Sequence, residues 1–493
     1  MNNKLKVGIL TGEVSYLWND QLRVIRDIMD HPNMELCLFI QRSNEEKNHF
    51  EELTQQINSS AGNISKWLCR NQIKKEAKLF KEWKTVDPEK VISRIGLIKR
   101  LMVSPEKEGL LEKYSQQACE KIIPFNLDLI IDIDHKAIYS DNILSAAKFG
   151  VWRLHFGENL IPQTGPSGFS EIINRLPFCT VLLLQFLPGQ EKIFVLDKAY
   201  YNRHWSFLKN FYDLHYAAIS LLLKNLRKLL LVNPINATPI GHLLPPTVPG
   251  LKSKLRYFFN FYFRLATKVK EEISYKLFGT RRECWTLFWS QGDFFKTNIN
   301  RITPQELPQD EFWADPFLYS YKNNTYVFFE NYPYKRKIGK ISVGNIEKGK
   351  VTNVRDILVK DYHLSYPQII EEDGQLFLLP ETGKNMRIEV YKCTKFPYGW
   401  ELYSTAFEGE FVADTTYFQD VNGDRWLFLN KGGSINAELH IYKIDNLKLE
   451  RIIPHSLNPV YIDCRKARNA GAIFMYQNEY YRPNQRCIYG VYG

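Results

Sequence analysis

The sequence lacks the patterns that mark metal, redox and membrane-spanning proteins. Its eight cysteines are scattered, with no CxxC pair and no Cys/His spacing of the zinc-site type. We therefore expect buried or idle thiols in a reducing compartment, and no metal site. No stretch reaches about 18 apolar residues, so no membrane-spanning helix is predicted. The opening MNNKLKVGILTG has no signal-peptide apolar core, which favours a cytoplasmic protein.

Two further absences narrow the ligand classes. Gly8 and Gly12 follow the first apolar run without forming GxGxxG, so the dinucleotide-binding fingerprint is missing. The basic residues do not continue into a recognisable nucleic-acid-binding module, so no nucleic-acid partner is predicted. What is present is a net charge of +11 over 493 residues. That charge favours phosphorylated sugars, nucleotides or anionic lipid headgroups as partners, and the length predicts two or three domains.

The first half of the chain alternates short apolar runs with helical segments. Residues 6–10, 34–40 and 128–133 predict buried strands, and residues 17–29 have helical periodicity. Strands that alternate with helices predict a parallel sheet covered on both faces. We expect an α/β domain over residues 1–210.

One stretch of this half carries a family motif. It reads DLIIDIDHKAIYSDNILSAAKFGVWRLHFGENLIPQTGPSGFSEI, followed by TVLLLQFLPGQEKIF. Residues 128–200 thereby resemble the formyltransferase family that uses 10-formyltetrahydrofolate. The resemblance implies a Rossmann-type sheet, 10-formyltetrahydrofolate as cofactor, and acyl transfer to the amine of an amino sugar. Such transfer needs a donor aimed at the developing oxyanion and a base for the attacking amine.

The motif departs from the family at two of three catalytic positions. His155 stands at the position of the family's histidine, but Arg153 replaces its asparagine and Gly189 aligns with its aspartate. The resemblance implies His155 as catalytic, with Arg153 as a substitute oxyanion donor and Glu158 as a substitute base. The alternative for His155 is a satisfied polar residue at a strand end.

Residues 211–282 predict a basic helical and aromatic linker region. Its last part, LKSKLRYFFNFYFRLATKVK from Leu251, alternates basic and aromatic residues. Two interpretations stay open for residues 251–282. The helix either packs one aromatic face on a neighbouring domain or lies on an anionic membrane surface, which would make the protein peripheral to the membrane.

A phrase recurs in residues 283–493. Each copy has an apolar strand, a tight Asn/Asp/Gly turn and a second apolar strand, as in DPFLYSYKNNTYVFFE and DTTYFQDVNGDRWLFLN. Four copies, with anchors at residues 315, 367, 414 and 471, lie 52, 47 and 57 residues apart, close to the roughly 40–50 residues of propeller blades. The run WTLFWSQG at 285–292 is a candidate for a missing blade. Whether the ring closes, and whether the chain is truncated relative to its family, stays open.

The same half carries a second resemblance, through WADPFLY, FFENY, HLSYPQI, LPET, VADTTYF, RKARNAG and YYRPNQ. These phrases resemble the N-terminal region of the glucosamine inositolphosphorylceramide transferases and, distantly, the five-bladed propellers of arabinanase-type glycoside hydrolases. The fold class implied is α/β plus all-β, a formyltransferase-like domain followed by a five-bladed β-propeller-like domain. The function implied is a carbohydrate-active protein of cell-surface polysaccharide biosynthesis. Its first domain would act on or bind a sugar nucleotide, and its propeller would bind glycan.

Acidic residues recur at equivalent places of the repeats. Asp315 and Asp414 are expected at inner-strand starts, and Glu330 and Glu381 at the ends of second strands. The resemblance to hydrolases implies that such carboxylates flank a glycosidic bond. The residues expected to bind hydroxyls or phosphate are His363, Arg468 and Arg482.

One departure weakens the hydrolase interpretation. Ser365-Tyr366-Pro367 stands where the hydrolases have Asp before Pro. Three roles for the acids stay open: a structural network with arginines, carbohydrate binding, or glycosidic catalysis. The alternatives for the whole chain are a non-catalytic glycan-binding protein with a decayed transferase domain, and a propeller glycoside hydrolase.

Overall fold

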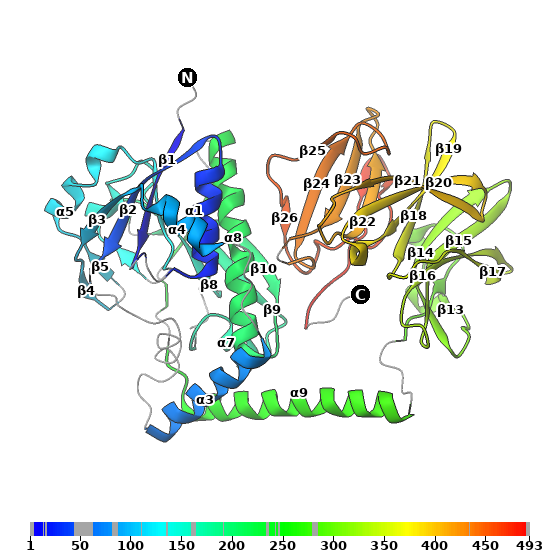
Figure 1. Cartoon of the computed structure of the whole chain (residues 1–493), viewed down its shortest axis with the longest axis horizontal. Helices are drawn as coiled ribbons and strands as arrows, with labels where there is room; N and C mark the ends of the chain where they lie inside the picture. The colour runs from blue at the N-terminus through cyan, green and yellow to red at the C-terminus, as the bar shows by residue number, and fades with distance from the viewer. Residues whose placement is uncertain are drawn as a thin grey trace. The chain divides into compact units, whose positions relative to one another are not determined.

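The chain forms two compact units in a computed structural model. One unit comprises residues 1–264 and 488–491, and the other residues 265–487 and 492–493. Figure 1 colours the first unit from blue to green and the second from green to red. The structure describes residues 4–12, 14, 17–43, 63–80, 87–109, 111–134, 137–158, 164–190, 192–232, 236–241, 243–244, 247–278, 284–432 and 434–489.

A mixed eight-stranded sheet is the centre of the first unit, in the order β11-β10-β9-β8-β6-β1-β2-β3. The parallel strands are β1 (Leu5–Thr11), β2 (Met34–Arg42), β3 (Lys99–Val103), β6 (Leu129–Asp132) and β8 (Val151–Phe156). The antiparallel strands are β9 (Phe178–Phe186), β10 (Ile193–Asn202) and β11 (Thr238–Ile240). The α/β prediction is confirmed, with an antiparallel flank added to the parallel strands.

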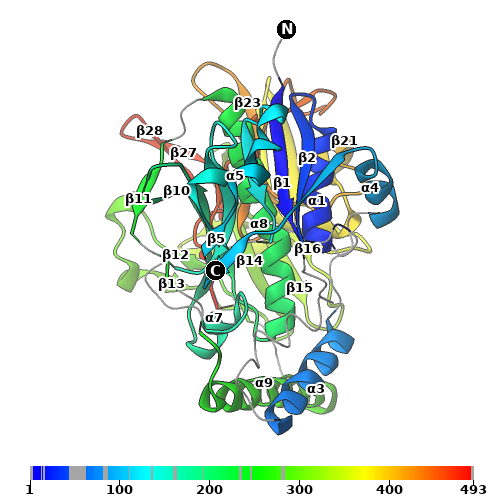
Figure 2. The same cartoon turned by 90° about the vertical axis from the view of Figure 1, so that its left-hand side faces the viewer.

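Helices cover both faces of this sheet. On one face, α1 (Asn19–Asp30) and α8 (Phe207–Leu231) pack side by side, as Figure 2 shows. On the other, Leu10, Ile40 and Leu184 share a core with residues of α5 (Gln116–Glu120) and α6 (Asp141–Leu144). The remaining helices are α3 (Asn63–Leu79), α4 (Pro88–Ile95), α7 (Phe169–Ile173) and the 3-10 turn η2 (Ile123–Phe125). A small sheet joins β4 (Glu106–Glu108), β5 (Leu111–Lys113) and β7 (Ile138–Tyr139).

The structure divides the chain at a different place from the boundaries drawn on the sequence. The boundary at residue 210 falls inside α8, whose residues 211–231 belong to the α/β unit because the helix buries its apolar face on the sheet. Along the chain, the boundary between the two compact units falls within α9 (Leu251–Phe278). Residues 279–282 of the predicted linker lie outside the described residues.

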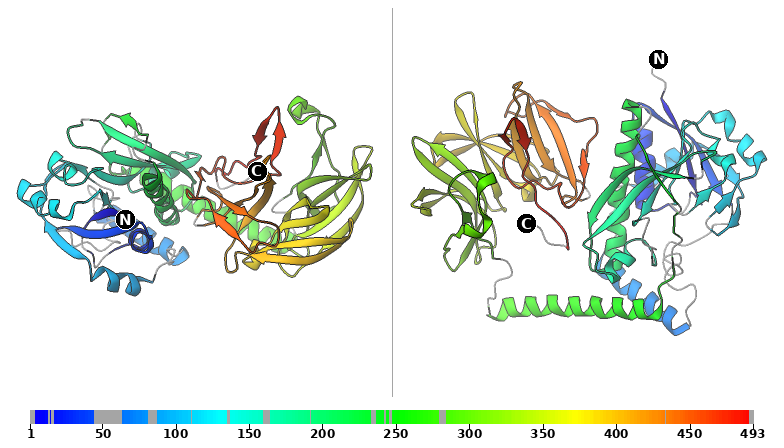
Figure 3. Two further views of the ribbon diagram at one scale, coloured as in Figure 1. Left: turned by 90° about the horizontal axis from the view of Figure 1, so that it is seen from above. Right: turned by 180° about the vertical axis from the view of Figure 1, so that it is seen from behind.

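Three antiparallel sheets, two of four strands and one of five, form the blades in the described part of the second unit. Their strands are β14 (Glu311–Tyr321), β15 (Asn324–Pro333), β16 (Lys340–Glu347) and β17 (Lys350–Leu358); β18 (Ser365–Glu372), β19 (Gln375–Glu381), β20 (Ile388–Lys395) and β21 (Gly399–Ala406); and β22 (Ala413–Gln419), β23 (Arg425–Asn430), β24 (Glu438–Ile444) and β25 (Ile452–Pro454). A short strand, β26 (Tyr461–Ile462), also pairs with β24. The first strands of successive blades contact one another, and Figure 3 shows the sheets fanned side by side. The all-β, propeller-like prediction is confirmed.

The fourth repeat contributes a hairpin, β27 (Phe474–Tyr476) with β28 (Glu479–Tyr481). The run expected to supply a missing blade forms β12 (Phe288–Trp289), which pairs with β13 (Thr303–Pro304). Between these two strands, Phe295 in η3 (Phe294–Lys296) packs its ring on Tyr476 and Tyr481, with centroids 4.3 and 5.0 Å apart. The start of the unit therefore reaches the fourth repeat through aromatic rings.

Candidate functional site

Each blade places one bulged residue at the same point of its first strand. Asp315, Tyr366 and Asp414 have φ of 49°, 49° and 45°, a left-handed conformation that is uncommon outside glycine. The strand pairing shifts at each of these points, as expected for β-bulges, which re-aim side chains. Tyr366 is therefore the second-blade equivalent of the two aspartates. The sequence anchor at residue 367 was one position too far along.

A second set of equivalent residues lies on the neighbouring strand of each blade. Glu330 pairs with residue 314, Glu381 with residue 365 and Asn430 with residue 413. The register thus places Glu330 and Glu381 at corresponding positions, as the repeats predicted. The third blade has an amide, Asn430, at this position, and the acidic pattern of the sequence did not predict it.

Two of the predicted acids share one buried arginine. The Arg468 Nε donates to Asp414 Oδ2 at 2.5 Å, and its Nη2 lies 3.9 Å from Glu381 Oε2. The backbone N–H of Asp414 also donates to Glu381 Oε2 at 3.1 Å. The side chains of Arg468, Asp414 and Glu381 are only 12%, 3% and 9% exposed, so solvent screens this pairing little. Burial, and next the charge of Asp414, raise the pKa of Glu381 well above its ordinary value.

Asp315 faces the same group from the first blade. Burial, and next the charge of Asp414, raise its pKa to about 7, while Arg468 and a hydrogen bond from the Tyr366 backbone oppose that shift. We call Asp315, Glu381, Asp414 and Arg468 the axial cluster. The cluster therefore combines an acid that titrates near neutral pH with carboxylates held by an arginine. Such a combination can bind hydroxyl groups and can move a proton.

Amide and hydroxyl groups brace the axial cluster. Asn469 donates to the Asp414 carbonyl at 2.7 Å, and Gln485 donates to Asp414 Oδ2 at 3.4 Å. The Tyr366 hydroxyl contacts Thr416 Oγ1 at 2.9 Å and accepts from the Gly471 N–H at 2.7 Å. Aligning the repeats on the bulged position instead of the proline would have identified Tyr366 from the sequence.

Three other predicted residues lie outside this cluster's direct contacts. Glu330 Oε1 lies 3.4 Å from His363 Nε2, and the Gly339 N–H donates to His363 Nδ1 at 3.0 Å. Burial lowers the pKa of His363, with Lys384 adding to the shift. Arg482 donates to Asn469 Oδ1 at 3.0 Å and to backbone carbonyls of the preceding segment. Arg482 thus contacts Asn469, the residue that donates to the Asp414 carbonyl.

In the α/β unit, a buried ion network occupies the carboxyl edge of the parallel strands. Arg42 contacts Asp132, Glu112 and Asp134 at 3.0, 3.0 and 2.9 Å. Arg153 lies beside this network: burial lowers its pKa, while the charge of Asp132 opposes the shift. Its guanidinium also stacks over the Phe186 ring, 5.3 Å from the centroid. Arg153 is therefore a buried residue, 4% exposed, that packs inside the α/β unit.

His155 and Glu158 lie further along the same strand edge. Burial, with the charge of Arg153, lowers the pKa of His155 to about 3, so its imidazole is neutral at physiological pH. Glu158 Oε1 accepts a hydrogen bond from Thr180 at 3.1 Å. At the position of the family's aspartate, Gly189 lies in an exposed turn with φ of 65°. The residues present thus lack the carboxylate of the folate-dependent set, and we derive no step through 10-formyltetrahydrofolate.

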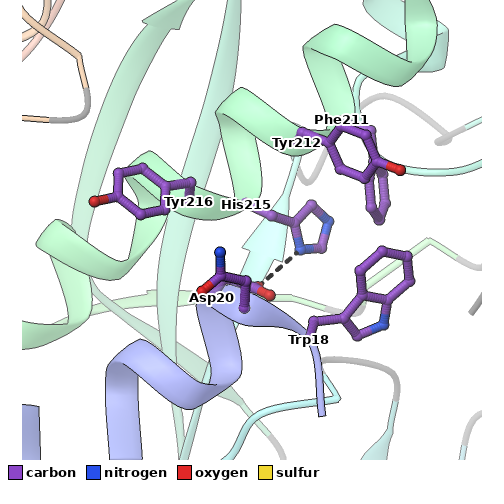
Figure 4. A pocket seen from close by; sticks show the side chains of 7 residues that line it. Trp18, Asp20, Phe211, Tyr212, His215 and Tyr216 are labelled. Atoms are coloured by element: carbon purple, nitrogen blue, oxygen red, sulfur yellow. Dashed lines mark ion pairs between the residues drawn. The ribbon is translucent and has the colours of Figure 1, made fainter. Parts of the chain in front are cut away.

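An aromatic pocket lies where α1 begins beside α8, and Figure 4 shows its lining. Trp18 packs on Phe211 with ring centroids 5.6 Å apart, and His215 stacks on Phe156 at 4.1 Å. His215 Nδ1 lies 3.4 Å from Asp20 Oδ2. These contacts join the two helices to the sheet. Among the described residues, no group of three His, Cys, Asp or Glu side chains could hold a metal ion.

The two-unit fold and the axial cluster define a protein with an α/β domain and a propeller-like domain. Residues 300–493 match the family model described as glucosamine inositolphosphorylceramide transferase 1, N-terminal. The similar curated proteins bear that same name. The one from Oryza sativa subsp. japonica is 32% identical over 190 residues, covering 37% of this chain and 25% of the relative. The one from Arabidopsis thaliana is 30% identical over 194 residues, covering 38% and 25%.

The predicted resemblance of the second half to this family is thereby confirmed for residues 300–493. The chain spans about a quarter of the length of the curated relatives that it matches. Solved structures resemble both units. A sugar N-formyltransferase from Shewanella sp. FDAARGOS_354 has a TM-score of 0.31 and 10% identity, covering 52% of this chain and 86% of that one. An exo-β-1,3-galactanase from Phanerochaete chrysosporium has a TM-score of 0.29 and 11% identity, covering 36% and 43%.

Proposed function

We propose that the all-β unit binds a carbohydrate at the axial cluster. The observation that carries this proposal is that carboxyl groups from three blades gather around one arginine: Glu381 and Asp414 lie within 3.9 Å of Arg468, and the pKa of Asp315 responds to its charge. Asp315 comes from the first blade, Glu381 from the second and Asp414 from the third. Charged acceptors and donors in one place suit the hydroxyl groups of a sugar, because charge-assisted hydrogen bonds are about twice as strong as neutral ones.

The names of the curated relatives support a sugar-bearing lipid headgroup as the ligand class. Those names join glucosamine to inositolphosphorylceramide. Arg468 suits a phosphate or a sugar hydroxyl, because a guanidinium donates charge-assisted hydrogen bonds to such oxygens. We therefore propose an amino sugar or an inositol phosphate as the ligand of the second unit.

Calorimetry on the full chain tests this proposal. Glucosamine, myo-inositol phosphate and their conjugate would be titrated into the protein and into a Glu381→Gln variant. We expect binding of at least one of them, weakened about tenfold or more by the substitution, since a hydrogen bond to a charged group contributes roughly 1.5–3 kcal/mol. Glu401→Gln, on the outer strand of the same blade, is the matched control. Equal binding by the Glu381 and Glu401 variants would refute the site.

A second function, glycosidic chemistry, is favoured by one observation. The pKa of Asp315 is raised to about 7 beside the carboxylate of Asp414. A carboxyl group with a raised pKa beside a second carboxyl group is an arrangement that can supply an acid and a base or nucleophile. Reducing-sugar release that disappears in Asp315→Asn, while sugar binding persists, would support this function. Binding without any release would leave the unit a binding module.

Formyl transfer by the α/β unit stays a prediction. What supports it is the neutral imidazole of His155 at the end of β8, which can donate a hydrogen bond to an oxyanion. The test mixes the protein with 10-formyltetrahydrofolate and an amino-sugar nucleotide and measures release of tetrahydrofolate. Turnover that is lost in His155→Ala would establish the activity, and no turnover by the parent protein would refute it.

A further inference from the structure

Helix α9 carries a row of exposed apolar side chains along its whole length. At 100° per residue these side chains fall within a sector about 120° wide. Each is between 42% and 70% exposed, which is unusual for large apolar groups repeated over seven turns. The row comprises Leu251, Leu255, Phe259, Tyr262, Phe263, Val269, Ile273 and Leu277.

A different face of α9 packs on the α/β unit. Lys254, Tyr257 and Phe261 are the buried residues of the helix, and they lie outside the sector of the row. The Tyr257 hydroxyl donates to Glu76 at 2.6 Å, and Phe261 packs on Trp205 with centroids 5.0 Å apart. The helix therefore packs on a neighbour, which is the first of its two interpretations. Tyr262, the least exposed member of the row, shares in this packing, because its hydroxyl donates to Gln72 Oε1 at 3.0 Å.

Basic residues border the row. At 100° per residue, Lys252 and Lys270 fall just inside one edge of the row and Arg256 just outside it, and the helix holds seven Lys or Arg against two Glu. A helix with an apolar face, aromatic residues and a basic border is the kind that lies at the boundary between headgroups and acyl chains. Two copies of α9 packed row to row would bring these basic borders together, so the charge disfavours a second copy as the occupant.

The dimensions agree with a surface position. The 28 residues of α9 extend about 42 Å at 1.5 Å per residue. Within the part of the chain that the structure describes, no helix is both long enough and apolar enough to cross a bilayer. We propose that α9 lies flat on an anionic membrane surface, with the apolar row inserted among the lipids and the basic border at the headgroups.

Vesicle flotation with the full chain tests the charge requirement. We expect the protein to float with vesicles that contain phosphatidylserine, and to float much less with pure phosphatidylcholine. Raising the salt concentration should weaken binding, because the screening length falls from about 10 Å at 0.1 M to about 3 Å at 1 M. Absence of binding to both kinds of vesicle would overturn the proposal.

Substitutions on the row test the apolar contribution. Leu255→Gln, Phe259→Gln and Ile273→Gln, combined, should lower the partition coefficient about a hundredfold or more, since each large side chain contributes roughly 1.5–3 kcal/mol on burial. The matched control replaces Leu318 and Leu402, which are 61% and 51% exposed on the all-β unit. An equal loss in the control, or none in the row variant, would contradict an inserted helix.

Charge reversal tests the basic border separately. Lys252→Glu with Lys270→Glu should weaken binding to anionic vesicles about tenfold or more, since each basic residue near such a surface contributes about 1 kcal/mol. Lys350→Glu with Lys448→Glu gives the same change in net charge away from α9 and should leave binding nearly unchanged. Light scattering of the parent and of the row variant tests whether a second copy of the chain covers the row instead. A parent that is dimeric and a row variant that is monomeric, with equal vesicle binding by both, would assign the row to a second copy.

Discussion

Replacement of Arg468 by methionine should destabilise the all-β unit strongly. The substitution keeps most of the side-chain volume but removes the donor that faces Asp414 at 2.5 Å and Glu381 at 3.9 Å. It also leaves Asn436 Oδ1 without the Arg468 donor that lies 2.8 Å away. Removing one partner of a buried ion pair leaves an uncompensated charge and costs roughly 3–5 kcal/mol.

Hydrogen exchange followed by mass spectrometry gives the measurement, since it separates the all-β unit from the rest of the chain. In peptides of β22 to β24, the free energy of opening should fall by roughly 3–5 kcal/mol. Arg451→Met is the control, because that arginine is 68% exposed and lies 3.9 Å from Asp445. Adding Asp414→Asn to the Arg468 variant should restore at least about 1 kcal/mol. A loss below about 1 kcal/mol, or one equal to the control, would refute the buried-pair argument.

Three further perturbations test the axial cluster and the α/β unit. Asp315→Asn should flatten the pH dependence of stability: the folded pKa of about 7 exceeds the ordinary 3.8, so the parent loses stability as pH rises through that window. The loss is at most about 4 kcal/mol, and unfolding free energies at both ends of the window measure it. Tyr366→Phe should cost about 1–3 kcal/mol in urea unfolding, because the Gly471 N–H loses its acceptor. Glu76→Gln should lower the melting temperature of the α/β unit, because this buried carboxylate accepts from Tyr257 and from the start of α8; an unchanged melting curve would show that solvent replaces those bonds.

Much of the fold follows from local pattern. The buried strands β1, β2 and β6 are apolar runs with helices between them, and period and composition suffice to predict such elements. The repeated hairpins were equally readable, because the turn chemistry recurs with each blade. The contact between the start of the second unit and its fourth repeat could not be predicted in this way, since Phe295 meets Tyr476 through ring packing that no local pattern encodes.

The candidate site also has features that the sequence predicted and features that it did not predict. Repeat spacing alone predicted the equivalence of Asp315 with Asp414, and of Glu330 with Glu381. It could not show that Glu330 pairs with His363 while Glu381 joins the arginine, because the side chains around each carboxylate come from distant segments. Alignment on proline also hid Tyr366, because the repeats share the bulged position and not the proline.

The sequence by itself determined the alternation of strands and helices, the blade repeats and the acidic positions, because these depend on neighbours close along the chain. Only the tertiary structure decided which charges meet. Arg153 belongs beside a buried ion network, although its motif position suggested catalysis. The tertiary structure also separated the two faces of α9: Tyr257 faces the protein, while the row that includes Phe259 faces outward. Burial and long-range charge are properties of the packed chain, and no stretch of residues carries them alone.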